Sequence, residues 1–168
     1  TKLLQAASGA VYNDDGDYTS IATERYELVL DLVEERQHSI VFYHWDHQLE
    51  ELVKEAKSRK LSFSVWNPDQ PEIADEFQEG KYQVLFAHPQ SAGHGLTLTR
   101  GTATIWASPT YNLEHYLQGL KRVHRIGQRE KTETIVIVAE GTVDEKVWAA
   151  LQAKSVNMTA LLTELEAA

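Results

Sequence analysis

Short apolar runs alternate with longer amphipathic segments along most of this chain, and no other feature constrains its fold as strongly. The apolar runs have strand length and are rich in Val, Ile, Phe and Trp: residues 39–45, 61–66, 82–87, 103–108 and 133–140. Segments of helical periodicity lie between and after them: 23–36, 46–59, 71–79, 112–125, 142–153 and 156–166. Strands that are apolar on both faces are typical of a parallel sheet that is covered on each side. The pattern therefore predicts an α/β fold, a parallel sheet flanked by helices.

Helix start signals and one turn-forming segment divide the chain further. Asp46 and Asn112 stand directly before helical segments, and Thr142 is followed three residues later by Glu145, which is a capping-box spacing. The sequence NDDGDYTS within the first 20 residues is typical of a turn and predicts a connector. We therefore expect a linker at 1–22, the α/β domain at 23–153 and a bracing C-terminal helix at 154–168.

Composition excludes several kinds of protein. The chain has 168 residues and no cysteine, which excludes disulfides and cysteine-ligated zinc and fits an intracellular, reducing compartment. No segment approaches the roughly 18 consecutive apolar residues of a membrane span, so we expect no membrane partner. The formal net charge of −9 argues against a protein that coats nucleic acid through its overall charge, although a local basic face remains compatible with it.

A polar stripe is predicted on the helix at 112–125. Gln118, Arg122 and Arg125 fall within roughly 60 degrees of one another on a helical projection, and His115 joins them. The opposite side is apolar and is expected to pack on the sheet, which would point the stripe away from the core. Its members are Leu113, Tyr116, Leu117, Leu120 and Val123. Such a stripe is either a solvated face or a surface that meets an external anion.

The loop HPQSAGHGLTL (88–98) follows the run at 82–87, at the carboxyl end of a predicted parallel strand. Open α/β sheets bind ligands at this edge, and the small residues of the loop would let the backbone approach a phosphate or a ribose. Gly93 and Gly95 do not complete a dinucleotide fingerprint, because the third glycine and the distant acidic residue are lacking. We expect no metal site, since packing roles suit His44 and His47 better than a metal pair.

Three segments, taken together and in this order, resemble the C-terminal motor lobe of the Swi/Snf-like ATPases of helicase superfamily two. They are LFAHPQSAGHGLTL (85–98), ATIWASPTYNLEHYLQGLKRVHRIGQ (103–128) and TIVIVAEGTVDEKV (134–147), and IVFYHW (40–45) is similar to the first signature strand of that lobe. The resemblance covers residues 24–153, with HRIGQ and the preceding glutamine and arginine as its most specific part. It implies a RecA-like, P-loop NTPase-type domain in a DNA translocase, cytoplasmic or nucleoid-associated in a prokaryotic or viral source. Residues 1–22 would then lead from an N-terminal RecA-like lobe of the same parent chain.

The resemblance also implies roles for individual residues. Arg125 would be the arginine finger on the γ-phosphate of ATP, with Arg122 beside it or bridging to the partner lobe. Gln118 would polarise the same region, and Gly95 and Thr97 would lie near the ribose. A guanidinium suits this task because its planar fork stabilises the charge that spreads over the transferred phosphoryl oxygens.

Double-stranded DNA is the second partner that the resemblance implies. The phosphate backbone of the tracked strand would meet four residues of the loop, namely Gln90, Ser91, Ala92 and Gly93. The chain departs from its family here, since relatives usually carry Thr-Arg where this chain has Pro89-Gln90, and asparagine where it has Thr97. A glutamine in place of the arginine makes the contact with the strand less electrostatic.

The sequence contains no G-x-x-x-x-G-K-[ST] motif, so it lacks the lysine and the hydroxyl that hold a triphosphate and its Mg²⁺. ATP and Mg²⁺ are therefore expected to be held mainly by the N-terminal lobe, and this lobe alone is predicted to be inactive. The alternative is a non-catalytic α/β binding or regulatory module whose arginine stripe holds an acidic protein partner. The two hypotheses share a fold and differ in what Arg122 and Arg125 meet.

Overall fold

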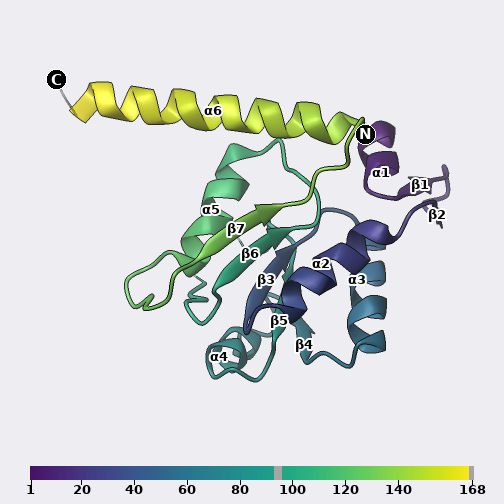
Figure 1. Cartoon of the computed structure of the whole chain (residues 1–168), viewed down its shortest axis with the longest axis horizontal. Coiled ribbons are helices and arrows are strands. Elements are labelled where there is room, and N and C mark those ends of the chain that lie inside the picture. The colour runs from purple at the N-terminus through teal and green to yellow at the C-terminus, as the bar shows by residue number, and fades with distance from the viewer. Residues whose placement is uncertain (93–95, 167–168) are drawn as a thin grey trace.

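A five-stranded parallel sheet in the order β4-β5-β3-β6-β7 forms the centre of the molecule (Figure 1). The computed structural model describes residues 1–92 and 96–166, with side chains as far as residue 159. The strands are β3 (Ser39–Phe42), β4 (Phe63–Val65), β5 (Val84–Ala87), β6 (Ala103–Trp106) and β7 (Glu133–Val136). Each lies within one of the predicted apolar runs, so the prediction of an α/β fold with a parallel sheet is confirmed.

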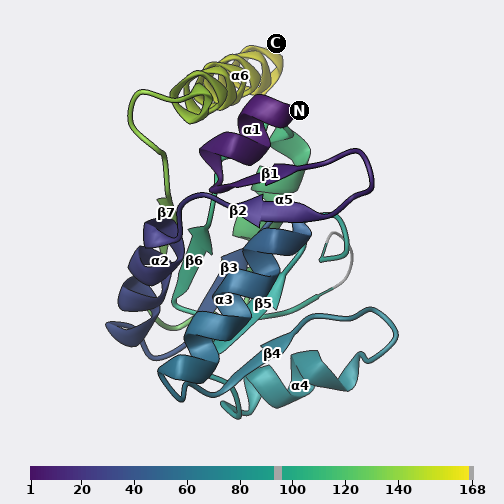
Figure 2. The same ribbon diagram turned by 90° about the vertical axis from the view of Figure 1, so that its right-hand side faces the viewer.

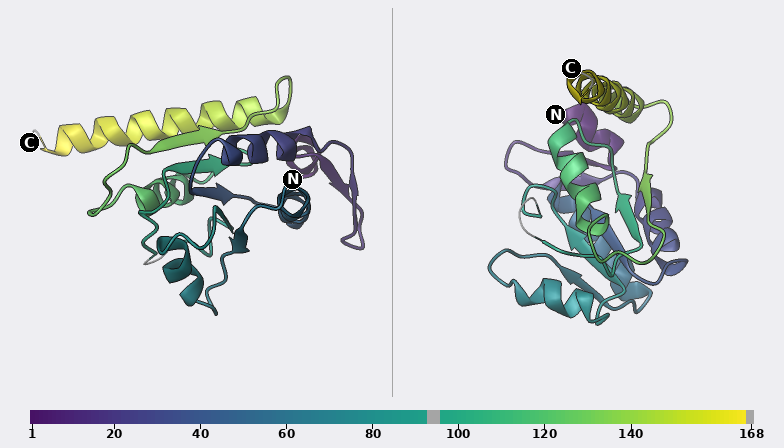
Figure 3. Two further views of the ribbon diagram at one scale, coloured as in Figure 1. Left: turned by 60° about the horizontal axis from the view of Figure 1, so that its bottom comes forward. Right: turned by 90° about the vertical axis from the view of Figure 1, so that its left-hand side faces the viewer.

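Helices cover both faces of the sheet (Figure 3). On one face lie α2 (Glu24–Glu34) and α3 (Asp46–Ser58), and on the other lie α4 (Glu72–Gln78) and α5 (Leu113–Val123). Successive residues of a strand point to opposite faces, so Val41 packs with α2 and α3, whereas Phe42 packs with α4 and α5. Strands β3, β5 and β6 are buried at every position, which explains why their sequences are continuously apolar.

The helix starts follow the sequence signals in part. Asn112 is the N-cap of α5, and its side chain accepts a hydrogen bond from the backbone nitrogen of His115 at 3.0 Å. Asp46, expected as a cap, is instead the first residue of α3. The side-chain oxygen of Gln48 accepts a hydrogen bond from the backbone nitrogen of His44 at 2.8 Å. A side-chain amide in the first turn of α3 therefore satisfies a backbone N–H that precedes the helix.

Residues 1–22 contain more structure than the connector that the sequence predicted. They form α1 (Lys2–Ala7) and an antiparallel hairpin of β1 (Ala10–Tyr12) and β2 (Tyr18–Ser20), which lies beside α3 (Figure 2). The turn was predicted correctly, and Asn13 Oδ1 stabilises it by accepting from the backbone nitrogens of Asp15 and Asp17 at 3.0 and 2.9 Å. The strands were missed because three residues carry too little periodicity to be recognised.

The C-terminal segment is one helix, α6 (Val143–Glu166), and the prediction of two helices is wrong. No glycine or proline interrupts residues 143–166, so nothing in the backbone ends the helix near residue 154. Figure 1 shows α6 running across the molecule and projecting past the sheet. Within the predicted bracing segment 154–168, Met158 is exposed, and Leu161, Leu162 and Leu165 lie outside the described side chains. Among the described helices none is long and apolar enough to cross a membrane.

One buried guanidinium joins the ends of the chain to the sheet. The side chains of Arg25 and Asp144 are 8% and 2% exposed, and Arg25 Nη2 lies 2.6 Å from Asp144 Oδ2. The same guanidinium donates to the carbonyls of Ala7, Ala107 and Ile137 at 2.8, 2.7 and 3.2 Å. Arg25 thereby links α2 to α1, to the residues that follow β6 and β7, and to the start of α6.

Replacing Arg25 with methionine is expected to lower the free energy of unfolding by about 3–5 kcal/mol, because the Asp144 carboxylate would stay buried without its partner. Urea unfolding followed by circular dichroism measures this. The matched control is Arg59→Met, with an expected loss of about 1 kcal/mol or less, because its partners Asp31, Glu34 and Glu55 are 62%, 46% and 27% exposed and stay in contact with water when the arginine is removed. Adding Asp144→Leu to Arg25→Met should recover part of the loss. Equal losses in the two single variants would contradict the assignment.

Candidate functional site

The helix that was predicted to carry both arginines ends before the second one. Helix α5 stops at Val123, His124 is its C-cap, and Arg125 stands in the loop that follows. The expected single stripe of Gln118, Arg122 and Arg125 along one helix is therefore wrong. A hydrogen bond from the backbone nitrogen of Arg125 to the carbonyl of Val123 at 3.1 Å tightens the chain directly after the helix.

The face that α5 turns to the sheet also differs from the prediction. A Cβ atom on Gly119 would lie 2.8 Å from Trp106 Cζ2 and 3.0 Å from Phe42 Cε2, so this glycine permits the helix to approach the aromatic rings of the sheet closely. With Gly119 against the sheet, Arg122 is turned inward and is only 7% exposed. Leu117 and Leu120, expected in the core, are half-buried. The prediction that Arg122 points outward is wrong.

Arg122 and Arg125 converge on one carbonyl oxygen. Arg122 Nη1 and Arg125 Nη1 donate to the carbonyl of Leu96 at 3.1 and 3.0 Å. Arg125 Nη1 also donates to Thr97 Oγ1 at 3.0 Å, and the backbone nitrogen of Leu98 donates to the carbonyl of Arg122 at 3.0 Å. Burial, and then the charge of Arg125, lower the pKa of the Arg122 guanidinium. The end of the loop 88–98 and the arginine pair thus form one unit.

Gln118 has a different partner. Its side-chain nitrogen donates to Glu114 Oε1 at 2.9 Å, one turn earlier on α5. The structure therefore brings Arg122, Arg125 and Thr97 together, whereas Gln118 pairs within its own helix.

The first part of the loop 88–98 is folded onto itself at the carboxyl edge of the sheet. Ser91 Oγ and the backbone nitrogen of Ala92 donate to the carbonyl of His88 at 2.9 and 3.1 Å, and Trp66 Nε1 donates to the carbonyl of Ser91 at 3.1 Å. Gln90 is exposed, whereas Ala92 is only 2% exposed, so of these two residues Gln90 is the one that a ligand could contact directly. Gly93 and Gly95 lie outside the described residues.

The sequence assigned no individual role to Gln128, the last residue of HRIGQ. Its side-chain nitrogen donates to the carbonyls of Thr99, Gly101 and Val123 at 3.0, 3.1 and 3.1 Å. Its side-chain oxygen accepts from the backbone nitrogens of Arg129 and Glu130, both at 2.9 Å. Sequence reasoning missed this residue because its partners are backbone groups, which a sequence pattern does not identify.

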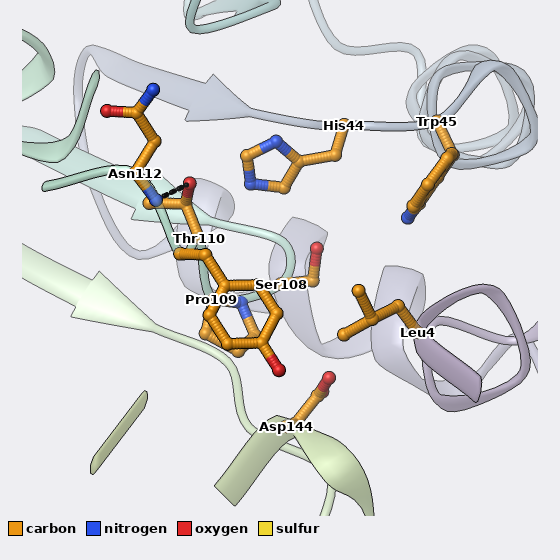
Figure 4. Close-up of a pocket in the computed structure, with 9 residues that line it drawn as sticks. Leu4, His44, Trp45, Ser108, Pro109, Thr110, Asn112 and Asp144 are labelled. Atoms are coloured by element: carbon orange, nitrogen blue, oxygen red, sulfur yellow. Dashed lines mark hydrogen bonds between the residues drawn. The ribbon is translucent and has the colours of Figure 1, made fainter. Parts of the chain in front are cut away.

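A cavity of about 300 Å³ opens at the carboxyl ends of β3 and β6 (Figure 4). After β3 the chain continues to β4 at one edge of the sheet, and after β6 it continues to β7 at the other edge. Open α/β sheets bind ligands at the point where neighbouring strands lead to opposite edges. Burial, aided by His88 and His115, lowers the pKa of His44 to about 4, so its imidazole is neutral near pH 7. The lining residues are Leu4, His44, Trp45, Ser108, Pro109, Thr110, Tyr111, Asn112 and Asp144. With no Lys or Arg among these described residues, the cavity is poorly suited to a phosphate.

His47 lies away from this cavity. Its ring nitrogens lie 3.1 Å from the hydroxyls of Ser8 and Tyr12, so His47 packs under the N-terminal segment. The two histidines that flank Asp46 in the sequence therefore have separate surroundings.

Comparison with known proteins places this geometry in a family. Residues 24–127 match the family model described as the helicase conserved C-terminal domain. Protein p41 of Acyrthosiphon pisum secondary endosymbiont phage 1 is 35% identical over 87% of the chain. The DNA annealing helicase and endonuclease ZRANB3 of Mus musculus is 32% identical over 69% of it. The SWI/SNF-related regulator of chromatin subfamily A-like protein 1 of Xenopus tropicalis is 31% identical over 76% of it. The chain spans 33%, 11% and 14% of the lengths of these relatives.

Solved structures agree on the fold. The C-terminal part of the Fun30 ATPase domain superposes with a TM-score of 0.71 at 15% identity, covering 79% of this chain and 46% of that one. The C-terminal domain of the DEAD-box protein Dbp5 superposes with a TM-score of 0.66 at 17% identity, covering 79% of each chain. The RecA-like fold expected from the sequence is confirmed. The chain belongs to the helicase conserved C-terminal domain family and is the C-terminal RecA-like lobe of a Swi/Snf-like protein of helicase superfamily two.

Proposed function

We propose that this lobe is the second motor lobe of an ATP-dependent DNA translocase and that it supplies Arg125 as the arginine finger. The observation that carries the proposal is the convergence of Arg122 and Arg125 on the Leu96 carbonyl, at the end of a loop that begins at the carboxyl edge of the sheet. The printed names of two relatives, a DNA annealing helicase and a regulator of chromatin, support DNA as the partner.

Arg125 is suited to meet a phosphate. It is exposed, and among the described residues both of its side-chain hydrogen bonds go to neutral oxygens, those of Leu96 and Thr97. Its positive charge is therefore not compensated by a carboxylate at these contacts. A guanidinium held in this way can stabilise the negative charge that develops on a transferred phosphoryl group.

Arg122 is assigned a supporting role beside Arg125. Because it is buried and bonded to the same carbonyl, it holds the end of the loop against α5 and adds positive charge behind the finger. This arrangement argues against the alternative of a binding module with an arginine stripe, which requires both guanidinium groups exposed on one helical face. Gln118 is not needed for the proposed contact, since its side chain pairs with Glu114.

ATP and Mg²⁺ are proposed to be held mainly by an N-terminal RecA-like lobe, since this chain has no P-loop motif. Arg125 would then reach the γ-phosphate across the interface between the lobes, with Thr97 near the ribose and Gly95 in the same loop. We further propose that DNA phosphates meet the start of the loop, chiefly at Gln90 and Ser91. One short loop would then contact the track at one end and the arginine pair at the other.

The isolated lobe is expected to show no ATP hydrolysis above the buffer rate, because the principal phosphate and metal ligands lie on another lobe. A coupled phosphate-release assay on the purified chain, with and without duplex DNA, measures this. Turnover that disappears in Arg125→Ala would contradict the prediction, because it would show a complete site within this lobe.

In the parent chain, Arg125→Ala is expected to lower DNA-stimulated kcat by roughly 10³-fold while ATP still binds, since a finger acts mainly on the transition state. Arg125→Lys should restore little of the rate, because an ammonium lacks the planar fork. Arg129→Ala removes an exposed arginine four residues later and should change kcat less than twofold. A loss below about tenfold in Arg125→Ala would count against the finger.

Gln90→Arg in the parent chain should tighten duplex DNA binding and steepen its salt dependence by about 0.9 in the slope of log K against log salt, because one more phosphate is neutralised. Affinity measured from 50 to 200 mM salt tests this. Gln37→Arg adds the same charge before β3, at the opposite edge of the sheet, and should leave the slope unchanged. Identical slopes for both variants would exclude Gln90 from the DNA track.

A further inference from the structure

Gln128 is the best-connected polar side chain of the loop that carries Arg125. Its amide nitrogen has two N–H groups, and they are shared among the carbonyls of Thr99, Gly101 and Val123. Its side-chain oxygen accepts hydrogen bonds from the backbone nitrogens of the next two residues, Arg129 and Glu130. This one side chain therefore ties together the end of α5, the segment before β6 and the chain beyond Arg125.

Little apolar packing holds this loop. Ile126 is fully exposed, and Gly127, with φ +103, has no atom within 4 Å of the position that a Cβ would occupy. The other anchors are a hydrogen bond between His124 and Thr132 and the contacts of Arg125 with Leu96 and Thr97. The backbone nitrogen of Gln128 donates to the carbonyl of Arg125 at 3.0 Å, so the anchored residue is joined directly to the backbone of the proposed finger.

We infer that Gln128 is a positioning residue that holds the backbone of Arg125 in place for catalysis. The inference rests on the proposed role of Arg125 as the finger. A catalytic group has to be held within about 0.5 Å of its productive position, and a displacement of about 1 Å can cost 10²-fold in rate. Gln128 provides this restraint through hydrogen bonds to backbone groups on both sides of the loop.

The chemistry of the site requires a carboxamide. Three carbonyl oxygens need a donor, and two backbone N–H groups need an acceptor, and one amide supplies both. Glutamate has the same shape but would bring a carboxylate oxygen against the three carbonyls. Methionine has a similar length but offers no donor. Either change would release the loop while leaving the guanidinium of Arg125 chemically unchanged.

The test is a double-mutant cycle in the parent chain, with DNA-stimulated ATPase activity as the readout. Gln128→Glu is expected to lower kcat about tenfold and to change the KM for ATP less than twofold, because ATP is held mainly by the other lobe. In the Arg125→Ala background the same change should lower kcat less than twofold, because the residue through which Gln128 acts is already absent. A purely structural role would produce the same loss in both backgrounds.

Gln78→Glu is the matched control. Gln78 of α4 bonds to the same segment from its other side, donating to Thr99 Oγ1 at 3.0 Å and accepting from the backbone nitrogen of Arg100 at 2.9 Å. It has no contact with the loop that carries Arg125 among the described hydrogen bonds, so kcat should change less than twofold. Thermal unfolding of every variant identifies any that fails to fold, and Gln128→Asn, which keeps the amide but shortens its reach, then replaces Gln128→Glu.

The outcomes separate the two proposals. A large loss in Arg125→Ala with unchanged kcat in Gln128→Glu, or equal losses from Gln128→Glu in both backgrounds, would overturn the positioning role alone. A loss below about tenfold in Arg125→Ala would overturn the finger, and the positioning role with it. A loss from Gln78→Glu equal to that from Gln128→Glu would mean that general softening of the segment 99–101 explains the effect, which also overturns the inference.

Discussion

The parallel sheet has to be covered on both faces, and the positions of the other elements follow from this requirement. Strands β3, β5 and β6 are buried at every residue, so neither face can be left to water. Helices α2 and α3 cover one face, and α4 and α5 cover the other. The loops that join strands to helices then gather at the carboxyl edge, where the loop 88–98 and the cavity beside His44 are found.

The close packing of α5 on the sheet accounts for the geometry of the candidate site. Gly119 lets the helix approach Trp106 and Phe42, and this orientation buries Arg122 instead of exposing it. The buried guanidinium then needs an acceptor, and the Leu96 carbonyl meets that need for both arginines. The proposed finger is thus held by the backbone of the same loop that is proposed to meet DNA. A shift at the track could reach the arginine pair through one short length of chain.

Polar groups, and not only the apolar core, hold the outer segments in place. Arg25 joins α1 and the start of α6 to the sheet through Asp144 and three carbonyls. Gln128 plays a comparable part for the loop after α5. In both places one side chain with several donors satisfies carbonyls from segments that are distant in the sequence, and removing it would leave those carbonyls without their described partner.

The sequence by itself determined the fold class, all five strands of the parallel sheet, the helices that cover it and the family, because apolar periodicity and ordered motifs are local properties. It placed Arg122 and Arg125 in one candidate region but gave them the wrong surroundings. A helical projection assumes an unbroken helix, and it does not show that Gly119 faces aromatic rings or that α5 ends at Val123. Only the tertiary structure decided that Arg122 is buried, that both arginines share the Leu96 carbonyl and that Gln128 anchors the loop. These contacts join side chains to backbone carbonyls of other segments, and a sequence does not single out those carbonyls because every residue type carries the same backbone groups.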